Sequence, residues 1–243
     1  MSQASVIQIK DLIVQYKDAR VIDGVTLSVK PGEIFGFLGP NGAGKSSTIK
    51  TILGLLFPKS GTVTVLGRSP SDVRSRAKIG YLPEETTYYR FLSPKEILTF
   101  YGRLFGIPRV ELKKRIERLL GLVGLEAVAN RMISTFSKGM TQKMSLAQCL
   151  INDPELLILD EPTSGLDPIA RMGLRKILSD LRQGGKTIFF SSHELSEVEM
   201  VCDSVAILKA GKMLKSGTLR EILGTRHELS LEQYFLKTIH GEF

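Results

Sequence analysis

The sequence predicts an α/β fold in which a mostly parallel sheet, with antiparallel strands at its N-terminus, carries an inserted all-helical subdomain. Apolar strand-like runs at residues 156–160 and 187–191 alternate with amphipathic helical patterns, which is typical of a parallel sheet covered on both faces. Between about residues 85 and 153 the spacing is helical throughout. We expect one domain over residues 1–243. Its parts are an α/β core at about 1–84 and 154–217, a helical subdomain at about 85–153 and a short helical extension at about 218–243.

Three strands are expected before the first helix. Turn signals at Asp23-Gly24 and Pro31-Gly32 separate runs that are rich in apolar and β-branched residues. The runs place strands at about 6–16, 25–29 and 33–38. The last of them is apolar, which predicts a buried strand.

Helices are predicted where apolar residues recur at i, i+3, i+4 and i+7. One follows Lys45 and should end at Pro58, and another begins with a capping box at residues 93–96. A third has Asp167 as its N-cap and Pro168 at its first position. The residues expected to face the core are Ile49, Ile52, Leu53 and Leu56; Ile97, Tyr101 and Leu104; Leu112, Ile116, Leu119, Leu120 and Val123; Ala170, Leu174, Ile177, Leu178 and Leu181; and, near the C-terminus, Leu231, Tyr234, Phe235 and Ile239.

The composition is that of a globular protein and argues against several kinds of site. Of the 243 residues, 42% are apolar and 24% are charged. The two cysteines, Cys149 and Cys202, cannot form a disulfide framework, and the three histidines are too scattered for a zinc cluster. No apolar run reaches the roughly 18 to 20 residues of a membrane helix, and the first residues lack a signal-peptide pattern. We expect a cytoplasmic protein that meets a membrane only through a partner.

The formal net charge of +8 has more than one explanation. Basic proteins often bind nucleic acid. Here the basic residues are dispersed, and a short group such as Lys113-Lys114-Arg115 fits a solvated helix face. Nucleotide phosphates, acidic lipid headgroups or an acidic partner would account for the rest. Nucleic acid is therefore the less favoured partner.

A glycine-rich loop follows the apolar strand and opens the first helix. It matches the pattern G-x-x-x-x-G-K-[ST], which predicts a P-loop NTPase core. Glycines let backbone N–H groups face phosphates, and the helix N-terminus adds partial positive charge. Lys45 can bridge the β- and γ-phosphates, and the Ser46 hydroxyl is placed to bind Mg²⁺. The residues expected to bind the nucleotide phosphates here are Gly39, Pro40, Asn41, Gly42, Ala43, Gly44, Lys45, Ser46 and Ser47.

Two acids end the buried run at residues 156–160. Ligands of open α/β sheets bind at the carboxyl ends of the strands, so Asp160 and Glu161 are expected beside the glycine-rich loop. Asp160 would join the Mg²⁺ shell, and Glu161 would polarise the attacking water. Two acids at a strand end could otherwise be merely solvated, but the phosphate loop makes the functional interpretation the stronger one.

Further motifs resemble those of ATP-binding subunits of ABC transporters, from Val6 to about Gly217. Residues 136–140 (FSKGM) stand where that family has its signature LSGGQ, and residues 164–167 (SGLD) resemble its D-loop. His193 resembles the switch histidine of the family. Tyr16 resembles the aromatic residue that stacks on adenine. Each motif is weak alone, and their order along the chain together with the phosphate loop carries the resemblance.

Two motifs depart from the family pattern. In the signature, Lys138 and Met140 replace glycine and glutamine, whereas Ser137 and Gly139, the donors expected to meet the γ-phosphate, are kept. The form SKGM resembles the branch that serves ABC-2-type permeases, which are mostly exporters. Where many relatives have glutamine, this chain has Glu84, whose carboxylate can still reach Mg²⁺ but adds negative charge near a triphosphate.

The resemblance implies a peripheral ATPase at the cytoplasmic face of the cell membrane. Two copies, a homodimer, would bind two ATP molecules with Mg²⁺ between them, head to tail, and drive separate integral-membrane permease subunits. One chain would supply Tyr16, its phosphate loop, the catalytic residues Lys45, Glu161 and His193, and the Mg²⁺ ligands Ser46, Glu84 and Asp160. The other chain would supply Ser137 and Gly139. Because closure completes each site, ATP would favour the closed dimer.

Aromatic residues are concentrated between residues 81 and 105. Aromatic side chains are enriched at interface anchors, which makes some of them candidates for contact with a permease. The candidates, for which core packing is the alternative, are Tyr88, Tyr89 and Phe91. Phe100 and Tyr101 are expected in the core.

Two other classes of function stay open on the sequence. An ABC-type ATPase acting on nucleic acid or ribosomes would suit the basic charge, but such relatives generally have tandem ATPase halves or a long coiled-coil insertion. An assembly ATPase with a soluble partner is the second. A kinase or GTPase would leave the signature and the histidine unexplained. The sequence does not name a cargo, because a motor subunit need not touch it.

Overall fold

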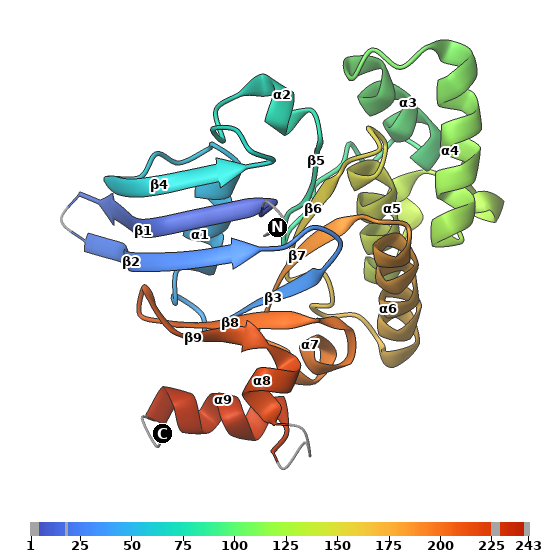
Figure 1. Cartoon of the computed structure of the whole chain (residues 1–243). Helices are drawn as coiled ribbons and strands as arrows, with labels where there is room; N and C mark the ends of the chain where they lie inside the picture. Colours follow the sequence, from blue (N-terminus) through green and yellow to red (C-terminus); the bar gives the residue numbers. More distant parts are fainter. Residues whose placement is uncertain (1–4, 18, 225–228, 241–243) are drawn as a thin grey trace.

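The computed structural model describes residues 5–17, 19–224 and 229–240, which form two sheets with helices around them (Figure 1). A three-stranded antiparallel sheet has the order β2-β1-β4, and a six-stranded sheet has the order β5-β6-β7-β3-β8-β9. The strands are β1 (Ile7–Tyr16), β2 (Ala19–Val29), β3 (Ile34–Leu38), β4 (Ser60–Val65), β5 (Ile79–Leu82), β6 (Leu156–Asp160), β7 (Thr187–Ser192), β8 (Ser204–Lys209) and β9 (Lys212–Thr218). Apart from β9, the strands of the larger sheet run parallel. This confirms the predicted α/β class.

The helices confirm the predicted insertion, because α3, α4 and α5 gather at one end of the molecule beyond β5 and β6 (Figure 1). In the described residues no helix is both long and apolar enough to cross a membrane. The helices are α1 (Lys45–Ile52), α2 (Val73–Arg76), α3 (Pro94–Leu104), α4 (Arg109–Val123), α5 (Lys138–Cys149), α6 (Pro168–Gln183), α7 (Leu195–Val201), α8 (Leu219–Leu223) and α9 (Leu231–His240), with 3-10 turns at Glu126–Val128 and Ile133–Thr135.

The central strands are buried on both faces, which is why they read as unbroken apolar runs. Every residue of β3, β6 and β7 is buried. Phe35 stacks on Phe189 with ring centroids 5.8 Å apart, and Phe37 lies 5.2 Å from the same ring. One core lies between the two sheets and includes residues of α1, and the other packs the helices against the opposite face of the larger sheet. This packing holds the carboxyl ends of the strands rigidly.

Several local predictions are wrong. Asp23-Gly24 is not a turn, because β2 continues through it and Gly24, with φ of 71°, accommodates a shift in pairing register with β1. Helix α1 ends at Ile52, well before Pro58, since Gly54 adopts φ of 69°. The elements β4, α2, β5, β8 and β9 were not predicted. The capping box of α3 and the Asp167 cap of α6 are confirmed.

The aromatic predictions in the helical subdomain are partly reversed. Tyr88 is half-buried and its hydroxyl donates to Ser145 Oγ at 3.1 Å, so it packs as a core residue. Phe100 and Leu104, expected in the core, are 53% and 68% exposed. They lie at i and i+4 on the outer side of α3, whereas Ile97 on its inner side is buried. Tyr101 does pack against the core, as predicted.

Gly80 in β5 is expected to tolerate no side chain. A Cβ there would lie 2.2 Å from the Cys149 carbonyl oxygen and 2.9 Å from Leu157 Cδ2, so backbone would have to move. We expect Gly80→Ala to lower the free energy of unfolding by about 1–3 kcal/mol, as overpacking does. Urea denaturation measures it.

The control is Gly173→Ala on α6, where a Cβ would meet nothing within 4 Å. Alanine is a better helix former than glycine, so this variant should match or exceed wild type by up to about 1 kcal/mol. If Gly80→Ala unfolded at the same urea concentration as Gly173→Ala, the close approach of β5 to the end of α5 would be wrong.

Candidate active site

Most of the predicted site residues lie along one edge of the larger sheet. Strands β5, β6, β7 and β3 are adjacent and parallel, so the residues that follow them meet at their carboxyl ends. These residues are Glu84 after β5, Asp160 and Glu161 at the end of β6, His193 after β7, and the glycine-rich loop after β3. The sheet order therefore brings together groups that are far apart in the sequence.

The glycines of the loop are required by close backbone contacts. A Cβ on Gly39 would lie 2.5 Å from the Leu208 carbonyl oxygen, and one on Gly44 would lie 2.5 Å from Ile22 Cδ1. Gly42 and Gly44 adopt φ of 77° and 108°, a region that side chains disfavour. Gly44 caps α1 without a side-chain hydrogen bond, which leaves the first backbone N–H groups of the helix free to face an anion.

Lys45 is buried and balances a buried carboxylate. The lysine is 7% exposed and Glu161 is 5% exposed. Lys45 Nζ donates to the Gly39 carbonyl oxygen at 2.7 Å and lies 3.3 Å from Glu161 Oε1. A buried charge needs a partner of this kind, so the site is built around a cation that an incoming anion could share.

Glu161 is held in a strained and well-defined position. Its φ of 50° is unusual for a residue other than glycine, and such strain concentrates at functional sites. Its backbone N–H donates to the Ser191 carbonyl oxygen at 3.1 Å. The His193 ring Nδ1 lies 2.8 Å from Glu161 Oε2, and the His193 backbone N–H donates to the same oxygen at 3.2 Å. One carboxylate oxygen therefore meets Lys45, and the other meets His193.

Asp160 lies one residue earlier, with a different environment. Its Oδ1 accepts a hydrogen bond from Ser191 Oγ at 2.5 Å. Burial raises the pKa of Asp160 above the usual carboxyl value, and the charge of Glu161 raises it further, while the Ser191 hydroxyl and Lys45 oppose the shift. A cation bound at this carboxylate would relieve the repulsion between the two acids.

The loop and the acids line one cavity of about 390 Å³. Its oxygen donors suit Mg²⁺, because Ser46, Glu84 and Asp160 all line it. Among the described residues, no group of three or more His, Cys, Asp or Glu side chains is close enough to hold a metal by itself. Mg²⁺ does not require such a group, because proteins usually bind it through one or two carboxylates and substrate phosphates. The lining residues are Val21, Pro40, Asn41, Gly42, Ala43, Gly44, Lys45, Ser46, Ser47, Glu84, Asp160 and Glu161.

Four of the predicted ATP-binding residues do not line this cavity: Gly39, Ser137, Gly139 and Tyr16. Gly39 still contacts the site, because its carbonyl oxygen accepts from Lys45 Nζ. Ser137 caps α5, its Oγ accepting from Met140 N at 3.3 Å, and Gly139 lies in the first turn of that helix near Ala170. Within one chain, this helix N-terminus and the phosphate loop form separate surfaces. Tyr16 is at the end of β1 and 44% exposed.

Residues that the sequence analysis missed support the predicted ones. Ser191 bonds both Asp160 and the backbone of Glu161, and its place in the motif Ser191-Ser192-His193 was a signal that could have found it. Arg171 of α6 donates from Nε to the Leu166 carbonyl oxygen at 2.9 Å and from one terminal nitrogen to Glu194 Oε1 at 3.0 Å. It thereby ties residues 164–167 to the segment that carries His193, a link that only the tertiary structure shows.

Comparison with known proteins decides the family. The ABC transporter family pattern matches residues 22–164, more than half of the chain and a span that includes the phosphate loop and both acids. This chain belongs to the ABC transporter family. A solved structure of an ATP binding subunit of an ABC transporter superimposes with a TM-score of 0.88 at 33% identity, over 97% of this chain and all of the other.

Curated ABC transporter proteins show the same relation. An uncharacterized ABC transporter ATP-binding protein of Synechocystis sp. is 46% identical over 202 residues, which are 82% of this chain and 57% of that protein. The Nod factor export ATP-binding protein I of Cupriavidus metallidurans is 37% identical over 224 residues, or 90% of this chain and 73% of that protein. The chain thus spans less than two thirds of the length of the Synechocystis relative.

Proposed function

We propose that the chain is the ATP-binding and ATP-hydrolysing subunit of an ABC transporter, and that two copies close around two ATP molecules to drive a separate ABC-2-type permease. The observation that carries this proposal is the arrangement around Glu161. A buried phosphate-loop lysine meets one of its oxygens, and a histidine from the neighbouring strand end meets the other.

The first expected step is an exchange of partners at Lys45. Without an anion, its ammonium is satisfied by the Gly39 carbonyl and Glu161. A triphosphate in the glycine loop offers stronger, charge-assisted partners, so Lys45 turns to the β- and γ-phosphates. Glu161 Oε1 is then free to accept a proton from a water molecule, while His193 holds Oε2 in place.

Magnesium ion is the expected second cofactor. Ser46, Asp160 and Glu84 would hold it, and when bound it supplies charge neutralisation for the transferring phosphoryl group. The glutamate at position 84 keeps an oxygen ligand there. The negative charge of Glu84 acts on neighbouring groups of the site. Burial, the charge of Asp160 and the charge of Glu84 together raise the pKa of Tyr81 to about 12.

We infer a dimer because a single copy does not bring Ser137 and Gly139 into the cavity of its own phosphate loop. Both residues lie at the N-terminus of α5 and do not line that cavity, so a second copy would have to supply them. Free N–H groups at that end would complete the cage around the γ-phosphate. ATP would then bind the closed pair better than the open one, and hydrolysis would remove that preference.

Ser137→Ala should leave ATP affinity of the monomer within about twofold while weakening ATP-dependent dimerisation roughly tenfold or more, because one hydrogen bond to a charged group is lost. Sedimentation of the hydrolysis-deficient protein with ATP measures both. The serine also caps α5, so Ser137→Asn, which keeps a capping oxygen, controls for fraying of the helix. Ser137→Thr, which keeps the hydroxyl, should dimerise normally. Loss of monomer binding in Ser137→Ala would contradict the assignment of Ser137 to the partner's site.

An exporter is the direction of transport that the comparisons support, since a similar protein carries export in its name. We place the chain at the cytoplasmic face of the membrane, held there by permease subunits. Tyr89 and Phe91, 72% and 67% exposed with ring centroids 5.8 Å apart, are the remaining candidates for that contact. Co-purification from detergent tests it: an integral-membrane partner supports the proposal, and salt-sensitive retention on RNA or DNA would favour a nucleic-acid ATPase instead.

A further inference from the structure

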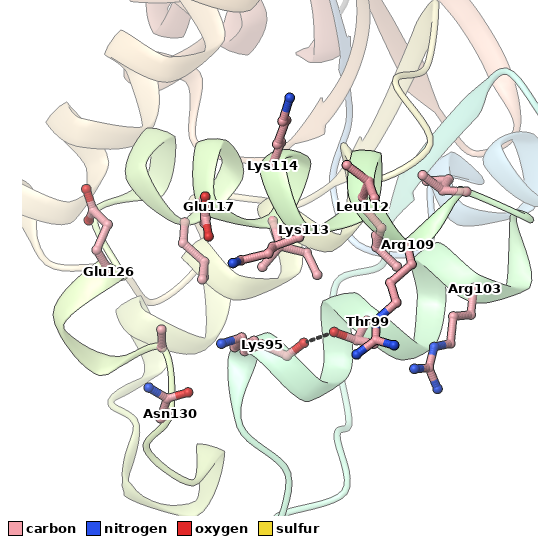
Figure 2. Close-up of a pocket in the computed structure, with 15 residues that line it drawn as sticks. Lys95, Thr99, Arg103, Arg109, Leu112, Lys113, Lys114, Glu117, Glu126 and Asn130 are labelled. Atoms are coloured by element: carbon pink, nitrogen blue, oxygen red, sulfur yellow. Dashed lines mark hydrogen bonds between the residues drawn. The ribbon is translucent and has the colours of Figure 1, made fainter.

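A second cavity, a hollow on the protein surface, lies between α3 and α4 (Figure 2). Its volume is about 1050 Å³, and it shares no lining residue with the phosphate cavity. Lys95 and Arg103 of α3 lie on one side, and Arg109 and Lys113 of α4 lie on the other (Figure 2). We call this hollow the α3–α4 groove. No step proposed for ATP hydrolysis uses it.

The groove lies in a basic part of the chain. Residues 89–131 contain nine Lys and Arg against four Glu, a net charge of +5 out of the total of +8. Two of the acids have other roles, because Glu96 completes the cap of α3 and Glu111 pairs with Arg115. Within residues 5–17, 19–224 and 229–240, no ion pair is formed by four exposed cations of the groove, Lys95, Arg103, Arg109 and Lys113. Their charge is open to an anionic ligand.

The floor of the groove argues against a docked amphipathic helix. Such a helix binds by laying an apolar face on exposed apolar side chains. Here Leu112, Ile116 and Leu120 are each 4% exposed, because packing within the helical subdomain already covers them. What the groove offers is charge on long, flexible stems, whose apolar parts line it together with the exposed side chain of Val110.

The turn between α3 and α4 adds exposed apolar side chains beside these cations. Leu104, Phe105 and Val110 are 68%, 46% and 74% exposed. Anionic membranes bind surfaces on which lysine and arginine lie next to exposed phenylalanine and aliphatic residues. The cations contact the phosphates of the headgroup layer, and the apolar side chains reach the boundary of the acyl chains. Glu117 and Glu126 line the part of the groove farther from Arg103, on the side where Lys95 lies (Figure 2), so the end near the turn has the larger net positive charge.

We propose that the α3–α4 groove binds the phosphate headgroups of anionic phospholipids, with Lys95, Arg103, Arg109 and Lys113 as the cations. The inference rests on the proposed function, because a permease partner would bring the helical subdomain to the membrane surface. Headgroup contact would add to the permease contact and help to orient the subunit. Each cation near such a surface contributes attraction that salt screens.

Sedimentation of the full-length protein with lipid vesicles tests the proposal. Wild type should bind vesicles that contain phosphatidylglycerol and phosphatidylcholine, bind less in high salt, and not bind vesicles of phosphatidylcholine alone. The groove variant, K95Q/R103Q/R109Q/K113Q, should bind the anionic vesicles about tenfold more weakly or worse. The control variant, K10Q/K30Q/K215Q/R220Q, removes the same charge from exposed positions elsewhere and should bind like wild type.

Other outcomes would overturn the proposal. Failure of wild type to bind anionic vesicles would do so directly, and equal losses in the groove and control variants would show that net charge alone is responsible. Displacement by millimolar inorganic phosphate would indicate a small-anion site instead of a lipid site. Loss of permease co-purification with vesicle binding intact would assign the groove to a protein segment. Unchanged ATP-dependent dimerisation of the groove variant shows that it folds and separates this proposal from that for ATP hydrolysis.

Discussion

Replacing Glu161 by glutamine should lower ATP turnover by about two orders of magnitude or more while leaving ATP binding intact. The carboxylate is the group placed to take a proton from water, and loss of a general base typically costs about 10²–10⁴ in rate. Glutamine keeps the size of the side chain and can still meet the His193 backbone N–H, so the site should stay folded. Because the γ-phosphate is then retained, the variant should accumulate as a dimer in ATP.

Phosphate release measures the turnover of Glu161→Gln, and sedimentation in the presence of ATP measures its dimerisation. Glu155→Gln is a suitable control, because Glu155 precedes β6 at its other end and its carboxylate pairs with exposed Lys78. It should turn over ATP at the wild-type rate. Near-normal turnover in Glu161→Gln would remove Glu161 from its role, and a variant that stays monomeric at every ATP concentration would argue against closure around ATP.

The loop and the two acids could be predicted because local sequence determines them. The glycine pattern needs no distant contact to be recognised, and an apolar run that ends in Asp160 and Glu161 indicates a buried strand with its acids at the edge. Strand β8 is a similar apolar run and could have been found in the same way. Strand β4 could not, because only Val65 of its residues is buried and the strand depends on pairing with β1.

Side-chain orientation was harder to predict than element type. Helical periodicity made Leu104 look like a core residue, and Phe100 was expected in the core as well. Only the neighbours of α3 decide which of its two apolar sides is buried. Tyr88 was predicted to be an interface residue, and its hydroxyl is instead directed inward by Ser145, some 57 positions away. The link from Arg171 to Glu194 likewise depends on how α6 and α7 meet.

Asp160→Asn should abolish most turnover and yet stabilise the empty protein. Asparagine can still accept the Ser191 hydrogen bond, but it removes a negative Mg²⁺ ligand, for which we expect a loss of turnover of about 10²-fold or more. The stability effect has the opposite sign. Burial raises the pKa of Asp160 in the folded chain, so its charged form costs stability at neutral pH. Removing the charge removes that cost.

The pH dependence separates this explanation from a general repacking of the site. The cost of the Asp160 charge is present above its folded pKa, shrinks as the pH falls through that pKa, and vanishes below the usual value of 3.8, where both states are protonated. The stability gain of Asp160→Asn should therefore be largest near neutral pH and fade on acidification, as urea midpoints would show. Asp153→Asn is the control with the reverse sign: its hydrogen bond with Lys186 lowers the pKa of Asp153, so this variant should lose a little stability at neutral pH and keep full turnover. If Asp160→Asn were no more stable than wild type at neutral pH, burial of the Asp160 charge would not carry the cost that its raised pKa implies.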